Sequence, residues 1–402
     1  MKLLIISQYF WPENFKVNDL AEDLVKRGHI VKVLTGKPNY PQGKYYKGYG
    51  LFSSRKENYK GVHIRRLPLI PRGSASGFRL FINYFSFVVT SCFYMLFHHK
   101  KYDAVLVFAT SPITVAFPAI LHRWFHKTPV LLWVLDLWPE SVSAAGNIQS
   151  KRILKMLEKM VKFIYKRVDK ILISSRGFLS SIEEKGIPTD KIFYAPNWAE
   201  EIYENPQTHR QKDASLMPEG FKVMFTGNVG VAQDCEALFA TAEQLSKMNS
   251  SVQLIIVGEG RKKVWFEEEV KKAQLKNVHF LGGFPAEEMP SLIIHADALL
   301  VSLKDEPIFA LTVPMRIQTA LTSSKPIAVM LNGESASIID EAGAGLTCNA
   351  GDAHTFAQNL HELSQYPQEK LSEMGKRGKE YYNQHFSRSK IISEIERLFL
   401  ND

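Results

Sequence analysis

The chain has 402 residues, of which 45% are hydrophobic and 23% are charged. This composition is that of a globular protein and excludes an intrinsically disordered one, and the length leaves room for two domains with substantial cores. The formal net charge of +9 favours anionic partners, such as nucleic acid, nucleotide-linked substrates or an acidic membrane surface. Cys92, Cys235 and Cys348 have no metal-binding spacing, so we expect reduced, buried thiols in a cytoplasmic protein. The chain opens on an apolar segment without a charged leader and cleavage site, and we do not expect secretion.

The first segments alternate between strand and helix. Apolar runs predict strands at Leu3–Ser7 and Ile30–Leu34, with a helix at about Val17–Lys26 between them. A strand, a helix and a strand in so short a stretch form a βαβ unit and imply a parallel sheet. The loop after the first strand should face the cleft in which open α/β sheets bind ligands, which makes Asn14 and Lys16 candidate acceptor-binding residues.

The segment from Leu80 to Phe97 is apolar on nearly every face and has basic residues on both sides. Its length is at the threshold of about 18 residues for a spanning helix. A strand at Ala104–Phe108 resumes the sheet at once, which argues against a membrane span. We favour a monotopic helix that dips into the cytoplasmic leaflet. A buried core helix or an oligomer contact is the alternative.

A second segment, Lys151–Lys170, places Ile153, Leu157 and Ile164 at helical spacing among many Lys and Arg residues. An anionic lipid surface attracts a basic amphipathic helix of this kind. We therefore expect both segments to contact a membrane, although a solvated charged face would have the same pattern.

An acidic residue follows the apolar run Val130–Leu135, which predicts another strand of the first sheet. Asp136 lies at the carboxyl end of this strand, where it could orient or deprotonate an acceptor hydroxyl or pair with a sugar hydroxyl. Glu140 is a second acceptor-side candidate. The alternative for Asp136 is a structural role at the N-terminus of a helix.

The strand and helix pattern restarts in the second half of the chain. Residues 199–220 are polar and suit a linker. Strands are then predicted at Lys222–Phe225, Val252–Val257, Val278–Leu281 and Ala298–Ser302, with helices between them. The sequence therefore predicts a second doubly wound α/β domain.

A glycine loop, Gly227-Asn228-Val229-Gly230, follows the first strand of this second domain. Glycine allows backbone N–H groups to approach a diphosphate closely. Arg261 and Lys263, at the end of the neighbouring strand, are candidate cations for its charge. No Gly-x-Gly-x-x-Gly follows the first strand of the chain, so we do not expect a nicotinamide-dependent enzyme.

The stretch from Lys304 to Leu321 joins an apolar strand to a helix that should open at about Met315, with Pro314 at its first position. A helix start presents free N–H groups, which bind phosphate. Glu306 could hold a hydroxylated ligand, and Arg316 could pair with its charge. An ordinary strand-to-helix connection is the alternative.

This stretch resembles the donor-site signature of family 4 retaining glycosyltransferases, a GT-B group that uses nucleotide sugars. The resemblance is carried by Glu306-Pro307-Ile308-Phe309 and by Ser324-Lys325-Pro326, while Thr319 replaces the second Glu of the family. The Val-Pro-Met-Arg helix start and the Asp-Leu-Trp-Pro-Glu segment at Asp136 resemble the subgroup that builds bacterial O-antigen and colanic acid, including N-acetyl-L-fucosamine transferases.

The resemblance extends over essentially the whole chain and implies a GT-B fold, in which two doubly wound Rossmann-like domains face a central cleft. Residues 1–197 would form an acceptor- and membrane-binding domain, with a C-terminal helix at 380–402 packed on it, and residues 198–379 would bind the nucleotide sugar. Catalysis would involve Asp136 and Glu306 without a metal ion or cofactor. The donor-binding set is Gly227, Asn228, Gly230, Arg261, Lys263, Gly283, Phe284, Glu306, Thr312, Val313, Pro314, Met315, Arg316 and Thr319.

The function implied is transfer of a sugar, for example one of the N-acetyl-fucosamine type, from a UDP-sugar to a polyprenyl-diphosphate-linked saccharide in O-antigen or exopolysaccharide biosynthesis. The protein would lie on the cytoplasmic face of the inner membrane and would not bind nucleic acid. Two alternatives remain at this point. One is a UDP-sugar 2-epimerase, and the other is a membrane-bound nucleotide-sugar-binding scaffold with reduced catalysis.

Overall fold

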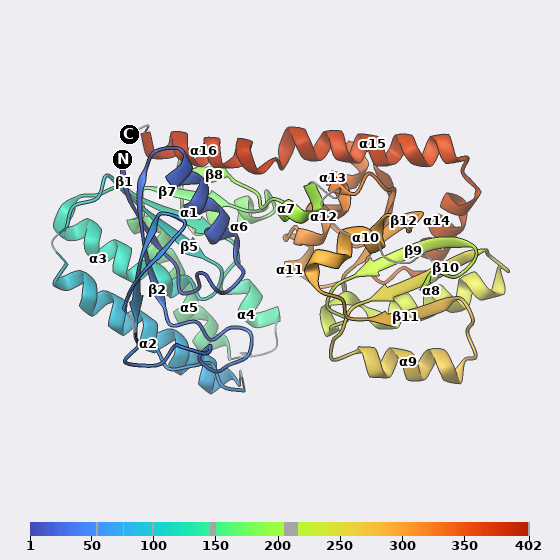
Figure 1. Ribbon diagram of the computed structural model, residues 1–402, viewed down its shortest axis with the longest axis horizontal. Helices are drawn as coiled ribbons and strands as arrows, with labels where there is room; N and C mark the ends of the chain where they lie inside the picture. The colour runs from blue at the N-terminus through green and yellow to red at the C-terminus, as the bar shows by residue number, and fades with distance from the viewer. Residues whose placement is uncertain (54, 75, 99, 145–149, 205–215, 401–402) are drawn as a thin grey trace. The chain divides into compact units, whose positions relative to one another are not determined.

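The computed structural model describes residues 1–53, 55–74, 76–98, 100–144, 150–204 and 216–400. The chain divides into two compact units (Figure 1). The first contains residues 1–196 together with 391–402, and the second contains residues 197–390. Of the predicted linker, residues 205–215 lie outside the described residues.

The first unit is built on an eight-stranded sheet in the order β3-β4-β2-β1-β5-β6-β7-β8. Neighbouring strands are parallel except β3 and β4, which form an antiparallel hairpin at one edge. The strands are β1 Lys2–Ile6, β2 Ile30–Gly36, β3 Lys56–Tyr59, β4 Val62–Leu67, β5 Ala104–Ala109, β6 Val130–Val134, β7 Lys170–Ile173 and β8 Ile192–Tyr194. The helices are α1 Lys16–Lys26, α2 Gly77–Leu96, α3 Phe117–His126, α4 Glu140–Ala144, α5 Lys151–Arg167, α6 Phe178–Glu184 and α16 Arg388–Leu400.

The central strands are where the apolar pattern predicted them. Every residue of β5 and β6 is buried, as expected for parallel strands covered on both faces. The hairpin of β3 and β4 was not predicted, because charged and polar residues take the place of a continuous apolar run in its strands. Its turn is formed by Lys60 and Gly61, which both have positive φ angles, 48° and 84°.

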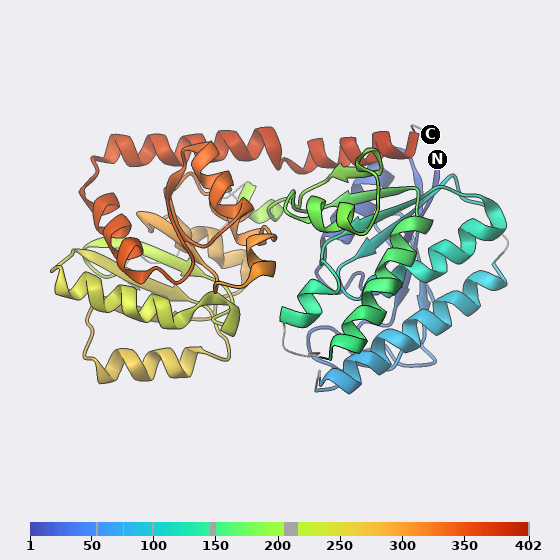
Figure 2. The same cartoon turned by 180° about the vertical axis from the view of Figure 1, so that it is seen from behind.

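Helices α2, α3 and α5 lie along one face of the first sheet (Figure 2). The C-terminal helix α16 is joined to the end of α1 by the carboxylate of Glu396. Its oxygens lie 2.7 Å from Arg27 Nη1 and 2.8 Å from His29 Nε2. The last segment of the chain thus closes against the first βαβ unit.

The second unit is built on a six-stranded parallel sheet in the order β11-β10-β9-β12-β13-β14. The strands are β9 Phe221–Thr226, β10 Val252–Val257, β11 Val278–Gly282, β12 Ala298–Ser302, β13 Ile327–Met330 and β14 Gly345–Cys348. The helices are α7 Glu201–Glu204, α8 Cys235–Lys247, α9 Lys263–Lys272, α10 Met289–Ile293, α11 Pro307–Ala310, α12 Met315–Thr322, α13 Glu334–Ala342, α14 Ala353–Gln365 and α15 Gln368–His385.

Both faces of the second sheet are buried in separate apolar clusters. Leu299 and Val301 of β12 belong to one cluster, whereas Ala298 and Leu300 belong to the other. Successive side chains of a strand point to opposite faces, so a strand buried on both sides needs a continuous apolar run. This requirement is why the predicted strands of the second domain were recognisable in the sequence.

The C-terminal segment, predicted to pack on the first domain from residue 380, forms two helices that belong largely to different units. Helix α15 packs on α12 and α13 of the second unit rather than on the first. The hydroxyl of Tyr382, at its buried face, accepts from the Ala199 N–H at 3.1 Å and donates to Glu204. These buried contacts keep α15 with the second unit, so the return to the first unit begins at about residue 391.

All three cysteines are free thiols. The expectation that all are buried is wrong in part, because only Cys235 is fully buried and Cys92 and Cys348 are half-buried.

Candidate active site

The glycine loop after β9 is locked to the loop after β10. The N–H of Gly227 donates to the Val257 carbonyl at 2.8 Å, and the N–H of Val229 donates to the Glu259 carbonyl at 2.9 Å. A Cβ on Gly258 would lie 1.8 Å from the Gly227 oxygen, and Gly227 itself has a φ of +118°. Only glycine allows this approach of two backbones, so the loop has one defined shape.

Arg316 lies against this glycine loop. Its Nη2 donates to the Asn228 carbonyl at 3.2 Å, and its guanidinium stacks on the Phe225 ring at 4.6 Å. Its Nη1 is buried and has no hydrogen-bond partner among the described residues. Burial lowers the pKa of Arg316 to about 10, so it stays protonated at neutral pH. The structure therefore places an incompletely paired cation beside the loop predicted to bind a diphosphate.

Helix α12 begins at Met315, with Pro314 as its N-cap rather than at its first position. The Ile317 N–H donates to the Pro314 carbonyl at 2.9 Å, while the N–H groups of Met315 and Arg316 precede the first intrahelical bonds and are available to an anion. Val313 is buried below the helix start, and the Thr312 hydroxyl donates to the Ile308 carbonyl at 2.8 Å. Thr312 thus has a structural contact within the loop.

Glu306 is the exposed N-cap residue of the short helix α11, which occupies the predicted loop. Its carboxylate makes no hydrogen bond or ion pair among the described residues. The neighbouring carboxylate of Asp305 accepts from Asn332 Nδ2 at 2.9 Å. Glu306 is therefore available to a ligand, while Thr319 lies half-buried farther along α12.

The other candidate cations differ in their surroundings. Lys263 Nζ lies 2.8 Å from a carboxylate oxygen of Glu259 and 3.7 Å from one of Glu267, so its charge is already balanced. Glu259 also accepts from the Gly283 N–H at 3.2 Å, which joins the predicted base-binding loop to this pair. Arg261 is exposed to solvent. Phe284 is half-buried against the core and adds no charge.

In the first unit, Asp136 follows β6 and accepts from Trp138 Nε1 at 3.1 Å. Burial raises the pKa of Asp136, while the hydrogen bond from Trp138 opposes the shift. A carboxylate with a raised pKa at the carboxyl end of a strand suits proton transfer or the binding of a hydroxyl group.

Glu140 has a different environment from the one predicted. Its Oε1 accepts from Lys185 Nζ at 2.7 Å and from the Ser181 hydroxyl at 2.6 Å. Although burial alone would raise it, these bonds hold the pKa of Glu140 below its ordinary value. The contacts indicate that Glu140 joins α4 to α6. Of the two remaining acceptor-side candidates, Asn14 is exposed and Lys16 is buried at the start of α1.

Sequence reasoning assigned no role to Glu13, which is only 2% exposed. Its Oε1 accepts from the N–H groups of Asn39 and Tyr40 at 2.8 and 2.7 Å. Burial raises the pKa of Glu13 to about 7. Glu13 therefore joins the loop after β1 to the loop after β2, a contact that no local sequence pattern signals.

Helix α2 buries only a narrow stripe, formed by Asn83, Phe87, Ser91 and Met95. Its outer face is exposed and largely aromatic, and we call it the α2 aromatic face. This face consists of Phe78, Phe81, Phe85, Val89, Phe93 and Leu96. The alternative that this segment is a buried core helix is therefore wrong for the single chain, in which the outer face of α2 is exposed. By length and composition alone, helix α2 is long and apolar enough to cross a membrane, and 22% of its most apolar 18-residue stretch is buried.

Comparison with known proteins agrees with this architecture. Residues 15–198 match the glycosyl transferase 4-like domain, and residues 220–365 match glycosyl transferases group 1. WbjE of Pseudomonas aeruginosa, a probable glycosyltransferase, is 28% identical over 83% of this chain and 81% of its own length. WcaI of Escherichia coli, a putative colanic acid biosynthesis glycosyl transferase, is 24% identical over 76% of this chain and 77% of its own length.

Among solved structures, sucrose-phosphate synthase of Thermosynechococcus elongatus superposes with a TM-score of 0.72 at 16% identity, covering 99% of this chain and 98% of its own. WaaG, a glycosyltransferase involved in lipopolysaccharide biosynthesis, has a TM-score of 0.67 at 12% identity and full coverage of both chains. The two sheets and their matches define a glycosyltransferase of the GT-B fold. The chain belongs to the family 4 glycosyltransferases, as its two matched domains and its named relatives show.

Proposed function

We propose that this enzyme is a retaining transferase that moves a sugar from a UDP-sugar to a polyprenyl-diphosphate-linked saccharide. The product would enter O-antigen or exopolysaccharide assembly at the cytoplasmic face of the bacterial inner membrane. The observation that carries the donor half of this proposal is the position of Arg316 against the glycine loop, with Nη1 buried and unpaired among the described residues.

Departure of a nucleoside diphosphate places negative charge on the leaving group. The unpaired Nη1 of Arg316 and the free N–H groups at the start of α12 would stabilise this charge as it develops, which speeds the step. The glycine loop would bring its backbone close to the diphosphate. In this proposal the protein's own donors balance the charge, without a metal ion or cofactor.

The exposed carboxylate of Glu306 follows β12 in the same unit and would accept hydrogen bonds from hydroxyl groups of the transferred sugar. Thr319 stands where family members carry a second carboxylate, so a threonine hydroxyl would face the nucleotide ribose. Support for a UDP-linked donor comes from the related GT-B fold of HepE from Anabaena, whose structure contains UDP and glucose.

On the acceptor side, Asp136 would bind or deprotonate the attacking hydroxyl. Burial raises the pKa of Asp136, which favours a group that can take a proton from that hydroxyl. A polysaccharide acceptor is supported by the colanic acid assignment of WcaI and by the role of WaaG in lipopolysaccharide biosynthesis. A lipid-linked acceptor is supported by the α2 aromatic face and by the exposed basic residues of α5 in the same unit.

The test is to incubate the purified protein with a panel of UDP-sugars and with membranes that contain polyprenyl-diphosphate-GlcNAc. Wild type is compared with Glu306→Ala and Asp136→Asn, and the anomeric configuration of the product is read by NMR. Sugar transfer to lipid with retention, lost in both variants, is the expected result. Nucleotide binding without transfer would instead indicate a scaffold, and conversion of the free sugar nucleotide without lipid would indicate an epimerase.

A further inference from the structure

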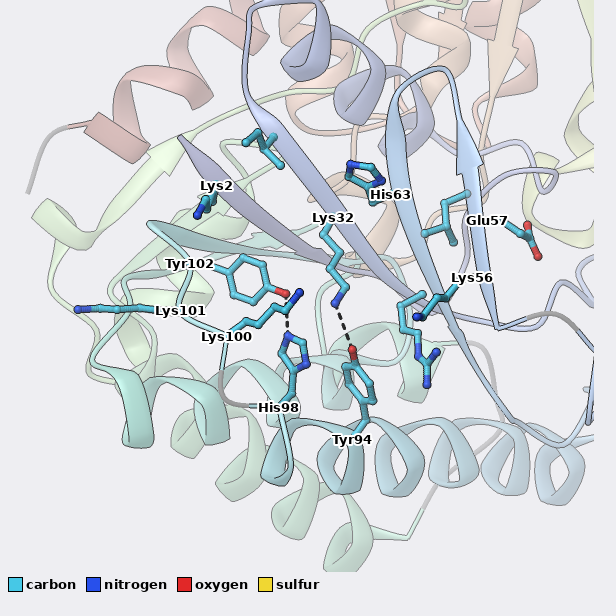
Figure 3. A pocket seen from close by; sticks show the side chains of 13 residues that line it. Lys2, Lys32, Lys56, Glu57, His63, Tyr94, His98, Lys100, Lys101 and Tyr102 are labelled. Atoms are coloured by element: carbon cyan, nitrogen blue, oxygen red, sulfur yellow. Dashed lines mark hydrogen bonds between the residues drawn. The ribbon is translucent and has the colours of Figure 1, made fainter.

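The first unit contains a cavity of about 980 Å³ that has no part in the proposed reaction (Figure 3). Its walls come from the start of the sheet and from the end of α2. Lys32 lies near the amino end of β2, Arg65 lies on β4, and Lys100 follows α2. Asp136 follows the carboxyl end of β6, whereas the cavity lies near the amino ends of the parallel strands. The cavity is therefore separate from the proposed acceptor site.

The side chains that line this cavity are strongly basic. Lys2, Lys32, Lys56, Arg65, Lys100 and Lys101 all contribute to its walls. Glu57 is the acidic residue among the lining residues, and both its oxygens are bound by Arg66, each at 2.9 Å. Its charge is therefore already balanced outside the cavity.

Lys32 and Arg65 converge on one aromatic ring inside the cavity. Lys32 Nζ donates to the Tyr94 hydroxyl at 3.1 Å (Figure 3). The Arg65 guanidinium lies 5.2 Å from the Tyr94 ring. The Nε of Arg65 is buried and has no hydrogen-bond partner among the described residues. A tyrosine supplies no negative charge at neutral pH, and neither Lys32 nor Arg65 forms an ion pair with a carboxylate among the residues that the structure describes.

Burial and the repulsion between the clustered cations lower the pKa values of Lys32 and His98. Burial, together with Lys100, Arg65 and Lys56, lowers the pKa of Lys32 to about 8. Burial lowers the pKa of His98 to about 4, with smaller contributions from Lys32, Lys100, His126 and Arg65, so this ring is neutral at pH 7. The C-terminus of α2 attracts a cation through its dipole, but the dipole equals only about half an elementary charge and does not offset the whole cluster. An anion in the cavity would relieve the repulsion.

We propose that this cavity binds a phosphate-bearing anion through Lys32, Arg65 and Lys100. Guanidinium and ammonium groups are the side chains best suited to phosphate oxygens. The anion is either the headgroup of an anionic phospholipid or a soluble phosphate. A lipid headgroup fits this position because the cavity lies next to exposed aromatic residues. Tyr94 and His98, which line the cavity, are adjacent in sequence to the exposed Phe93 and Phe97 at the end of α2. Acyl chains would then lie along the α2 aromatic face.

The experiment compares wild type with Lys32→Gln/Lys100→Gln. A second variant, Lys100→Gln/Lys101→Gln, changes only exposed side chains, so a loss of binding in this variant is not explained by misfolding. Lys271→Gln/Lys276→Gln removes the same charge from exposed positions of the second unit and serves as the control. Each protein is tested by co-sedimentation with phosphatidylcholine vesicles, with and without phosphatidylglycerol, and by thermal shift with inorganic pyrophosphate.

Removing two cations should weaken binding to phosphatidylglycerol vesicles by about tenfold or more, while the control binds like wild type. If only the thermal shift with pyrophosphate is lost, the anion is a soluble phosphate bound in the same cavity. Equal loss in the pocket variants and in the control, or no loss in any, would overturn the proposal. The result does not depend on sugar transfer, since neither readout uses a sugar donor.

Discussion

Arg316 Nη2 lies 3.2 Å from the carbonyl oxygen of Asn228, so the first turn of α12 is tied to the glycine loop that follows β9. Two segments almost 90 residues apart in sequence thereby share one cation. The Nη1 atom of the same guanidinium is buried and has no hydrogen-bond partner among the described residues.

Arg316→Gln should lower kcat for sugar transfer by about 10²–10³-fold, because it removes the cation proposed to stabilise the charge of the leaving group. Steady-state kinetics with the UDP-sugar measures this loss. Arg261→Gln is the matched control, since Arg261 is exposed. A larger loss of kcat in Arg261→Gln than in Arg316→Gln would indicate that Arg261, rather than Arg316, pairs with the diphosphate.

Gly258→Ala should destabilise the second unit by about 2–5 kcal/mol. The new Cβ would lie 1.8 Å from the Gly227 oxygen, at a backbone φ of +149° that side chains rarely adopt. Urea denaturation measures the change. Gly50→Ala, at a position with no atom within 4 Å of the added Cβ, should leave stability nearly unchanged. Equal stability of the two variants would contradict the close approach of the loops.

Glu13→Gln should change how stability depends on pH. Burial raises the pKa of Glu13 to about 7 from an ordinary value of 4.5. The folded protein therefore holds this proton more tightly than the unfolded chain, so the wild type loses stability as the pH rises from 4.5 to 7.

The glutamine does not titrate, and its oxygen can still accept from Asn39 and Tyr40. The difference in the free energy of unfolding, wild type minus variant, should thus fall by up to about 3 kcal/mol over this range. Denaturation curves at pH 5 and pH 8 measure it. A difference that stays constant with pH would mean that Glu13 is not titrating in the fold.

Phe85→Ser/Phe93→Ser should reduce binding to lipid vesicles by about tenfold or more per side chain, because each phenylalanine buried in lipid contributes about 1.5–3 kcal/mol. The two rings are 59% and 64% exposed, so the free energy of unfolding should change little. Val264→Ser, at a 64% exposed position on α9, is the control. Undiminished vesicle binding would leave the α2 aromatic face as a contact between protein chains.

Much of the fold could be predicted from the sequence because parallel strands buried on both faces need continuous apolar runs. The runs Ala104–Phe108 and Ala298–Ser302 are examples, and each lies within a buried strand. The edge hairpin of β3 and β4 was missed because charged and polar residues interrupt the apolar pattern of both strands. The C-terminal helices were assigned to one domain because helical periodicity does not show which surface a helix packs on.

The candidate site divides in the same way. Sequence by itself determined the residue types and their order along the chain: a glycine loop, Glu306 after a strand and Arg316 in a helix start, because these depend on local backbone chemistry. Only the tertiary structure decided which groups meet. It placed Arg316 on the glycine loop, bound Glu140 to Lys185, buried Glu13 and gathered Lys32, Arg65 and Lys100 around one cavity. Those contacts join residues far apart in sequence, and their energies depend on burial and distance, which no local pattern encodes.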